Sequence, residues 1–173
     1  MAKLTREEVE QIVKEAPGRR QLPNLREVDL SNMDLSEADL GVANLFGANL
    51  SEVNLCQANL SGADLTGADL GRADLSRANF TGAILHGANL VEANLNGANL
   101  SDASLIGVNL IKANLSGADL FKTDLSLSAL ARVDFSRANL GWTDLTGSLV
   151  VDADFSKAEM SGTKLGDPLC QNR

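Results

Sequence analysis

The sequence is poor in the residues that usually build a globular core or an active site. Aromatic residues make up 3% of its 173 residues, tyrosine is absent and there is one histidine. Because aromatic side chains supply much of the buried area in ordinary cores, the interior must be assembled from small and branched aliphatic residues. No serine, cysteine or carboxylate cluster lies beside an identifiable base, so the sequence gives no support for an enzyme.

Cysteine is scarce, and long apolar runs are missing. Cys56 and Cys170 are too few for a disulfide framework and lack metal-ligand spacing, so we expect two unpaired thiols. The segment MAKLTREEVEQIVKEA alternates charged and apolar residues, which matches neither a signal peptide nor a membrane span. These absences predict a cytoplasmic protein with no membrane segment, no metal site and no cofactor.

Basic residues are outnumbered by acidic ones, 15 to 23, which gives a net charge of −8. Nucleic-acid binding usually requires a basic patch, so the balance argues against direct binding of DNA or RNA. The acidity suits a basic partner or serves solubility alone.

The sequence is instead rich in a five-residue repeat. Every fifth residue from Leu25 to Leu165 is apolar, and it is leucine except at Phe80, Phe135, Phe155, Val150 and Met160. The residue two places before is usually alanine, and the residue just before is Asp or Asn at 22 of the 28 positions from 29 to 164. We call these the central, small and polar positions, and the two residues after the central one the first and second turn positions.

A period of five fits neither an α-helix nor a β-strand. On a helix each step of five turns the side chain by about 140°, and on a strand an odd step reverses the side, so either would expose half of the leucines. A chain that bends once per repeat keeps every leucine inside, and four bends close a coil. The coils stack at ~4.8 Å, and about seven fit residues 23–165.

Glycine occupies the second turn position in ten repeats, which favours a turn with positive φ. In other repeats this position holds Glu, Arg or Lys, so we expect more than one turn type.

The A(D/N)LxG pattern resembles the pentapeptide repeat family, over residues 23–165. The resemblance implies an all-β, right-handed quadrilateral β-helix, in agreement with the packing argument, and it brings no catalytic motif. Members are abundant in cyanobacteria, a few act in cell differentiation, and some acidic members inhibit DNA gyrase by imitating duplex DNA. We therefore expect a structural, protein-interaction solenoid with an unidentified protein partner, and the alternative is an acidic DNA mimic that inhibits gyrase.

The first segment, residues 1–22, is expected to form a short capping helix and a linker. Thr5 and Glu8 make a capping box, and Pro17-Gly18 ends the helix. An apolar stripe for covering the first coil consists of Val9, Ile12 and Val13.

The tail, residues 166–173, offers only Leu169 as an apolar plug. An open coil end exposes core and unpaired backbone, so we consider a homodimer formed through the C-terminal end.

Residues twenty apart should stack into four outer faces, which start at the repeats of Leu25, Leu30, Leu35 and Leu40. The summed charges of faces one to four are −2, −2, −2 and −3. A DNA mimic needs acidic groups concentrated on one surface, and this even spread argues against one. On face two the second turn positions mostly alternate in sign and predict a ladder of ion pairs: Glu52, Arg72, Glu92, Lys112, Arg132 and Asp152.

Apolar residues at outward positions are the candidate binding residues, because a soluble rod should avoid them. The primary candidate is a stripe on face two, formed by Val91, Ile111, Ala131 and Val151 with Ala129 and Leu149 beside them. Such β-branched stacks can also serve only to stabilise neighbouring coils. Secondary candidates are Phe46, Ile84, Ile106 and Leu127 on face one, and Phe121 and Trp142, with Lys122 nearby for a cation–π contact, on face four.

Overall fold

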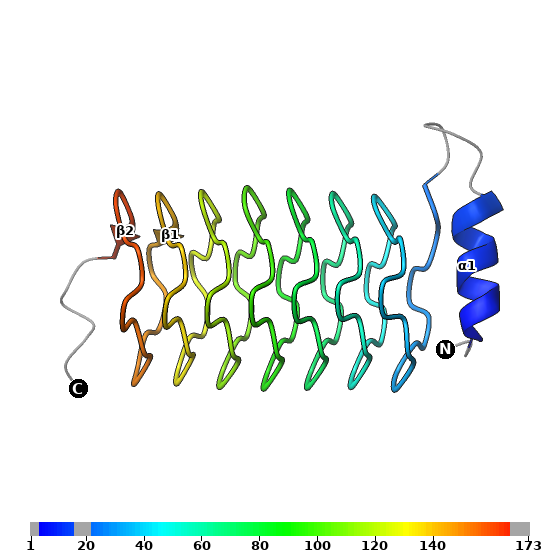
Figure 1. Ribbon diagram of the computed structural model, residues 1–173, viewed down its shortest axis with the longest axis horizontal. Helices are drawn as coiled ribbons and strands as arrows, with labels where there is room; N and C mark the ends of the chain where they lie inside the picture. Colours follow the sequence, from blue (N-terminus) through cyan, green and yellow to red (C-terminus); the bar gives the residue numbers. More distant parts are fainter. Residues whose placement is uncertain (1–3, 16–21, 167–173) are drawn as a thin grey trace.

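The computed structural model describes residues 4–15 and 22–166. It consists of helix α1 (Arg6–Glu15) and a stack of coils that ends in two short strands, β1 (Asp144–Leu145) and β2 (Lys164–Leu165). Figure 1 shows the coils stacked along one axis, with α1 at the end opposite β2. Pro17-Gly18, Leu169 and Cys170 lie outside the described residues, and so does nearly all of the predicted tail.

Each coil is twenty residues long. Parallel bridges join residues twenty apart at the polar positions, from Asn24 to Glu159, and β1 pairs with β2 in the same register. Backbone hydrogen bonds such as Leu25 N to Asn44 O, 2.8 Å, repeat along the four sides. Because each five-residue side makes one bridge before the chain bends, regular strand is confined to β1 and β2, while the pairing is that of a parallel sheet.

The interior is built from leucine and alanine. The central residues from Leu25 to Leu145 are at most 2% exposed, and the alanines at the small positions from Ala38 to Ala138 are also buried. Toward β2 some small positions carry a hydroxyl instead: Thr143 is buried and donates its Oγ1 to Leu120 O at 2.7 Å. The tight interior thus accepts a polar atom where the preceding coil supplies a carbonyl.

The second turn positions share a positive φ, so glycine and non-glycine repeats do not differ there, against the expectation of several turn types. Every second turn position from Glu27 to Gly162 has φ between 53° and 73°, whether it is glycine or not. The turn is closed by a bond from the small position to the central carbonyl, as from Ala38 N to Leu35 O at 3.1 Å, and a positive φ at the third residue is what a type II turn requires. Pairing between stacked coils keeps all turns in register and overrides the preference of the individual side chain.

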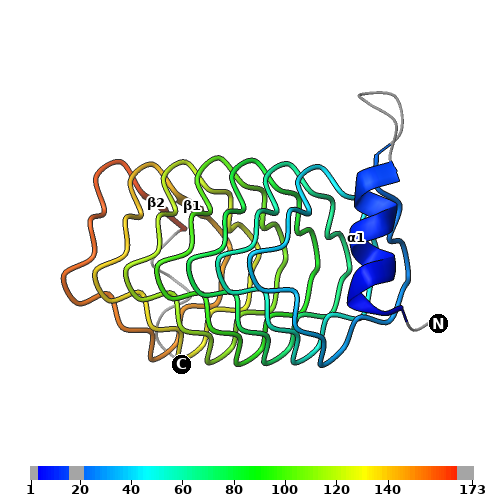
Figure 2. The same ribbon diagram turned by 45° about the vertical axis from the view of Figure 1, so that its right-hand side comes forward.

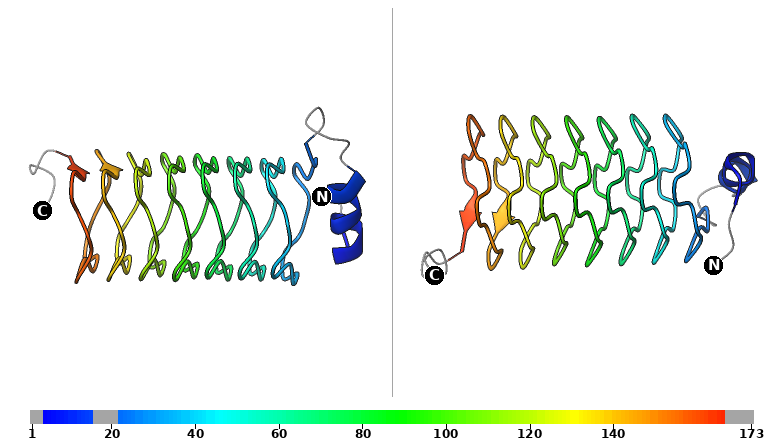
Figure 3. Two further views of the ribbon diagram at one scale, coloured as in Figure 1. Left: turned by 45° about the horizontal axis from the view of Figure 1, so that its top comes forward. Right: turned by 90° about the horizontal axis from the view of Figure 1, so that it is seen from below.

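Helix α1 lies against the first coil (Figures 2 and 3). Thr5 N donates to the Glu8 carboxylate at 2.7 Å and Glu8 N donates to Thr5 Oγ1 at 3.2 Å, which is the capping box. Val9 is 1% exposed, and Arg6 donates to two carbonyls of the coil, Asp34 O and Ser36 O. No helix in the described ranges is long and apolar enough to span a bilayer.

The coils next to β2 are less covered than the rest. Phe155 stacks on Phe135 with ring centroids 5.2 Å apart, yet Phe155, Val150 and Met160 are only partly buried. Leu165, the last central residue, is 57% exposed. The buried column of leucines therefore becomes accessible toward this end of the described chain.

Candidate functional site

The polar positions serve the architecture of the rod. Asp34 Oδ1 accepts a bond from Ser36 N at 3.0 Å, which holds the pKa of the Asp34 carboxyl below its usual range. Asn54, one coil later, donates its Nδ2 to the same oxygen at 3.0 Å. Neighbouring aspartates would repel each other, whereas an asparagine amide donates a hydrogen bond, so the mixture of Asp and Asn stabilises the stack.

The predicted ladder of ion pairs is present on face two. The pairs are Glu52–Arg72 at 3.7 Å, Arg72–Glu92 at 3.2 Å, Glu92–Lys112 at 3.0 Å and Arg132–Asp152 at 3.8 Å. Hydrogen bonds from Lys112 and Arg72 lower the pKa of Glu92. Exposed pairs of this kind contribute only about 0–1 kcal/mol to stability each. Because these side chains pair with one another, their charges are engaged within the rod.

The predicted face-two stripe forms two adjacent columns, and most of it is covered. Ala129 bridges Leu149, and the first turn positions of four successive coils lie beside them. Leu149 and Val151 are 62% and 55% exposed. The half-buried members are Val91, Ile111, Ala129 and Ala131. Stacking therefore covers the stripe except at its end near β2.

At that end the outward side chains form a compact apolar patch. Leu127 is 70% exposed and precedes Ala129 by two residues. Leu127 lies over Gly147 of the next coil and Ala129 bridges Leu149, so two neighbouring coils present apolar or glycine residues at this corner. We call these six positions the C-terminal apolar patch: Leu127, Ala129, Ala131, Gly147, Leu149 and Val151.

Sequence reasoning placed Leu127 on face one and thus missed its membership of this patch. The faces were treated as separate surfaces, but the corner between faces one and two joins them. The spacing of two between Leu127 and Ala129 was the signal that could have revealed it, since the intervening Ser128 is buried.

Leu127 occupies a position that is unfavourable for a leucine. Its φ is 60°, in the left-handed region, which costs roughly 1–2 kcal/mol for a residue with a Cβ. Its side chain lies over Gly147, where an added Cβ would be 2.9 Å from Leu127 Cδ2. Exposure to water and backbone preference both disfavour a leucine at this position.

Face four carries a second, aromatic group. Trp142 is 62% exposed with φ 60°, and its indole lies over Gly162, where an added Cβ would be 2.8 Å from Cδ2. Phe121 lies over Gly141 in the same way, at 3.1 Å. Lys122 Nζ is 5.3 Å from the Phe121 ring centroid, which confirms the predicted cation–π contact.

The secondary candidates on face one do not form one exposed surface. Phe46 is half-buried beneath Arg26, whose Cζ is 4.4 Å from the ring centroid. Ile84 is exposed and Ile106 is half-buried. The exposed His86 pairs its Nε2 with Ser104 Oγ at 2.7 Å.

Within the described residues no group of three or more His, Cys, Asp or Glu could hold a metal ion, and Cys56 is free. The hollows of the described surface are shallow grooves, one of which lies on face three near β2.

Two solved structures illustrate what the chain is similar to. One is alr5209, a pentapeptide repeat protein from Nostoc Pcc 7120, with 34% identity and a TM-score of 0.50 over 66% of this chain and 83% of that one. The other is a trypsin-treated form of QnrB1, a plasmid-mediated fluoroquinolone resistance protein, with 24% identity and a TM-score of 0.52 over 83% of this chain and 75% of that one. The second likeness concerns the fold alone. A search among curated proteins found no match.

The family profile "Pentapeptide repeats" matches the chain in eight copies. The matched residues are 24–62, 58–97, 88–126, 98–137 and 134–167. The match follows the repeats through nearly the whole stack of coils, and the chain belongs to the pentapeptide repeat family.

Proposed function

We propose that the chain is a non-enzymatic solenoid that binds a protein partner through the C-terminal apolar patch. The observation that carries this proposal is that three exposed apolar side chains, Leu127, Leu149 and Val151, gather at one corner of the rod. Contiguous exposed apolar surface on a soluble protein marks interaction sites. We place the interaction in the cytoplasm, where a free thiol such as Cys56 is maintained.

The stacked coils support a binding role because they hold the patch rigidly. Leu127 N bonds to Thr146 O at 3.0 Å and Arg132 N to Val151 O at 2.7 Å, so both coils of the patch are joined by backbone bonds. A surface that is ordered before binding loses little conformational entropy on association. Because the backbone of these coils is already hydrogen-bonded, a partner would be recognised by the side chains that depart from the repeat.

The test replaces two residues of the C-terminal apolar patch with residues that are typical of the repeat. Leu149→Asn with Val151→Ser installs residues that the same column carries at Asn49 and Ser51, so folding should be preserved. We expect affinity capture with the tagged double variant, from lysate of the native host, to recover at least tenfold less partner than the wild type, with an unchanged midpoint of urea unfolding.

The matched control for this test is Ile84→Asn. Ile84 is also an exposed apolar residue at a polar position, but it lies on another face. The control should capture the partner like the wild type. Equal capture by the patch variant and the wild type would refute the proposal.

A DNA-mimicking inhibitor of gyrase is the alternative function. The even charge of the four faces, between −2 and −3, argues against it, since phosphate mimicry needs acidic groups gathered along one surface. A supercoiling assay separates the two functions. We expect no inhibition at a large excess of protein, whereas inhibition near stoichiometric amounts would favour the DNA mimic.

A second copy of the chain is the other candidate occupant of the end near β2. The exposed Leu165 supports this contact. If it forms, light scattering at high concentration should show the mass of a dimer that Leu165→Asp returns to a monomer. A single monomeric species in the wild type would remove the homodimer.

A further inference from the structure

Most basic side chains in the described ranges are engaged by an acidic or aromatic partner. Those that are engaged are Arg6, Arg26, Arg72, Lys112, Lys122, Arg132 and Lys164. Four cations have no such partner among the residues that the structure describes: Lys14 on α1, and Arg77, Arg137 and Lys157 in the coils. The three in the coils lie in one column, the second turn positions of face three. An acidic protein thus concentrates unpaired cations along one edge.

Two glycines interrupt this column. Gly97 and Gly117 stand between Arg77 and Arg137, and a Cβ added at Gly117 would meet no atom within 4 Å. At ~4.8 Å per coil, Arg77 and Arg137 are about 14 Å apart along the rod. The column therefore has an open notch with a cation on either side.

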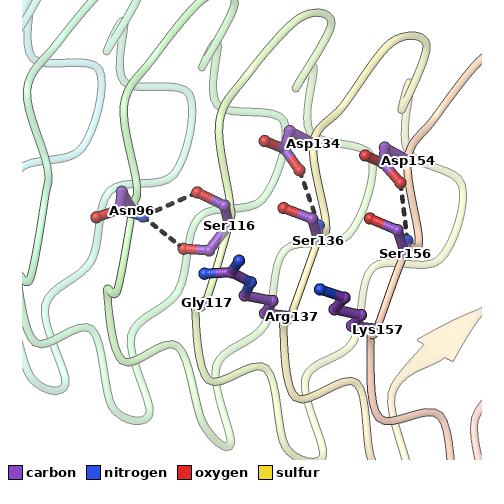
Figure 4. A pocket seen from close by; sticks show the side chains of 9 residues that line it. All are labelled: Asn96, Ser116, Gly117, Asp134, Ser136, Arg137, Asp154, Ser156 and Lys157. Carbon is purple, nitrogen blue, oxygen red and sulfur yellow. Dashed lines mark hydrogen bonds between the residues drawn. The ribbon is translucent and has the colours of Figure 1, made fainter.

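The notch continues into a groove of about 330 Å³ on face three. Figure 4 shows Arg137 reaching along this groove toward the coil of Gly117, and Lys157 reaching in the same direction toward the coil of Arg137. Asn96 forms part of the lining, and it donates its Nδ2 to Ser116 O and Oγ, both at 2.8 Å. The groove thus combines two free cations with hydroxyl and amide groups.

The acidic residues of the groove lie on the far side of the serines from the two cations (Figure 4). Asp134 and Asp154 accept bonds from Ser136 N and Ser156 N, each at 2.8 Å. The bond from the Ser156 backbone lowers the pKa of Asp154. These carboxylates are committed to their own turns and leave Arg137 and Lys157 to an outside anion.

We propose that this edge binds an acidic, extended peptide segment of a partner protein that runs along the rod. The inference rests on the proposed function, a solenoid that binds protein, and adds the chemistry of a second contact. Residues i and i+4 of an extended segment are ~13 Å apart, which is close to the separation of Arg77 and Arg137. Carboxylates at alternate residues would meet these cations, while Ser116 and Asn96 face the peptide backbone.

A peptide fits the groove better than a nucleic acid does. Nucleic-acid binding draws on many phosphate contacts made by extended basic surface, and this edge offers three cations.

The test uses the full chain and a fluorescein-labelled peptide of ten glutamates as the probe, followed by fluorescence anisotropy at low ionic strength. The key variant is Gly117→Glu, which sets a carboxylate one coil from Arg137, as Glu92 stands to Lys112. Non-glycine residues hold the same turn conformation at 18 positions, so this variant should fold. We expect the internal carboxylate to weaken probe binding at least tenfold.

Gly107→Glu is the matched control, because Gly107 also has a positive φ and no atom within 4 Å of an added Cβ, but lies on face one. It should bind the probe within twofold of the wild type. The double variant Arg137→Gln with Lys157→Gln should lose binding as Gly117→Glu does. No binding by the wild type, or equal weakening by both glutamate variants, would overturn the inference.

Two further arms define the ligand and separate this inference from the proposed function. A labelled ten-nucleotide oligo-dT should bind more weakly than the peptide, and tighter binding that Gly117→Glu abolishes would replace the peptide with nucleic acid. Leu149→Asn with Val151→Ser should bind oligo-glutamate like the wild type, because the C-terminal apolar patch is not part of the groove. Loss of peptide binding in that variant would contradict an independent site.

Discussion

The second turn position requires a positive φ from whatever residue occupies it, so each side chain there is chosen under a common backbone constraint. Glycine meets this constraint without strain, and Leu127, Val42 and Trp142 do not. These three are also exposed. A bulky apolar residue at such a position contributes little to folding, and this is the residue-scale argument for a binding role.

Replacing Leu127 with glycine should therefore raise stability. We expect Leu127→Gly to increase the free energy of unfolding by up to about 1 kcal/mol, because relief of the left-handed strain outweighs the small loss of contact with Gly147. The measurement is urea unfolding followed by circular dichroism.

The opposite change at the second turn position of another repeat is the control for this prediction. Gly97→Ala should lower stability by about 1 kcal/mol, since its φ is 65° and the nearest atom to an added Cβ, Arg77 Cγ, is 3.7 Å away and does not clash. A clear loss of stability in Leu127→Gly would make the leucine structural and remove this argument for binding.

The polar positions predict the response to acid. Backbone bonds from Ser36 and Ser156 lower the folded-state pKa of Asp34 and Asp154. A lowered pKa means that the stabilisation is complete above the unfolded value, about 3.9, and is lost as the pH falls through the folded value. The melting temperature should stay level from pH 7 to pH 5 and fall below about pH 4. A melting temperature that has already fallen completely at pH 5 would show that groups other than the carboxyls of Asp34 and Asp154 control the response to acid.

At the scale of elements, the coils could be predicted from sequence because the repeat is local and unbroken. The spacing of Leu25 and its successors predicted the bend of every repeat, and the alternating charges from Glu52 onward predicted the ion pairs. The positive φ shared by the second turn positions could not be predicted, since contacts between coils override the preferences of residues such as Glu27. The apolar patch was only partly predicted, because it depends on how two faces meet at Leu127.

Helix α1 should protect the first coil from opening. Val9 is buried in the core cluster, so Val9→Ala should lower stability by about 1–3 kcal/mol. Amide hydrogen exchange should increase in the repeats of Leu25 and Leu30 and stay unchanged in those near β1. Gln11→Ala, on the exposed side of α1, is the matched control. Unchanged exchange around Leu25 in Val9→Ala would show that the helix does not seal this end.

Over the whole molecule, the residues that build the rod differ from the residues that we propose to bind a partner. The interior and the polar columns repeat from coil to coil, and charge is spread evenly over the four faces. Two groups of side chains that depart from the repeat and have no internal partner lie toward β2: the C-terminal apolar patch, and the cations Arg137 and Lys157. A protein partner that uses both would approach this half of the rod.

Hydrogen exchange on the complex with the captured partner tests this account most directly. Most backbone amides of the described coils donate a hydrogen bond, and those near β2 include amides without one. A bound partner should therefore slow exchange where it covers turns and the amides near β2. The account predicts slower exchange in peptides that contain residues 126–132 and 146–152, with no change in those that contain residues 47–75. Slower exchange confined to residues 47–75, with the region around Leu149 unchanged, would contradict it.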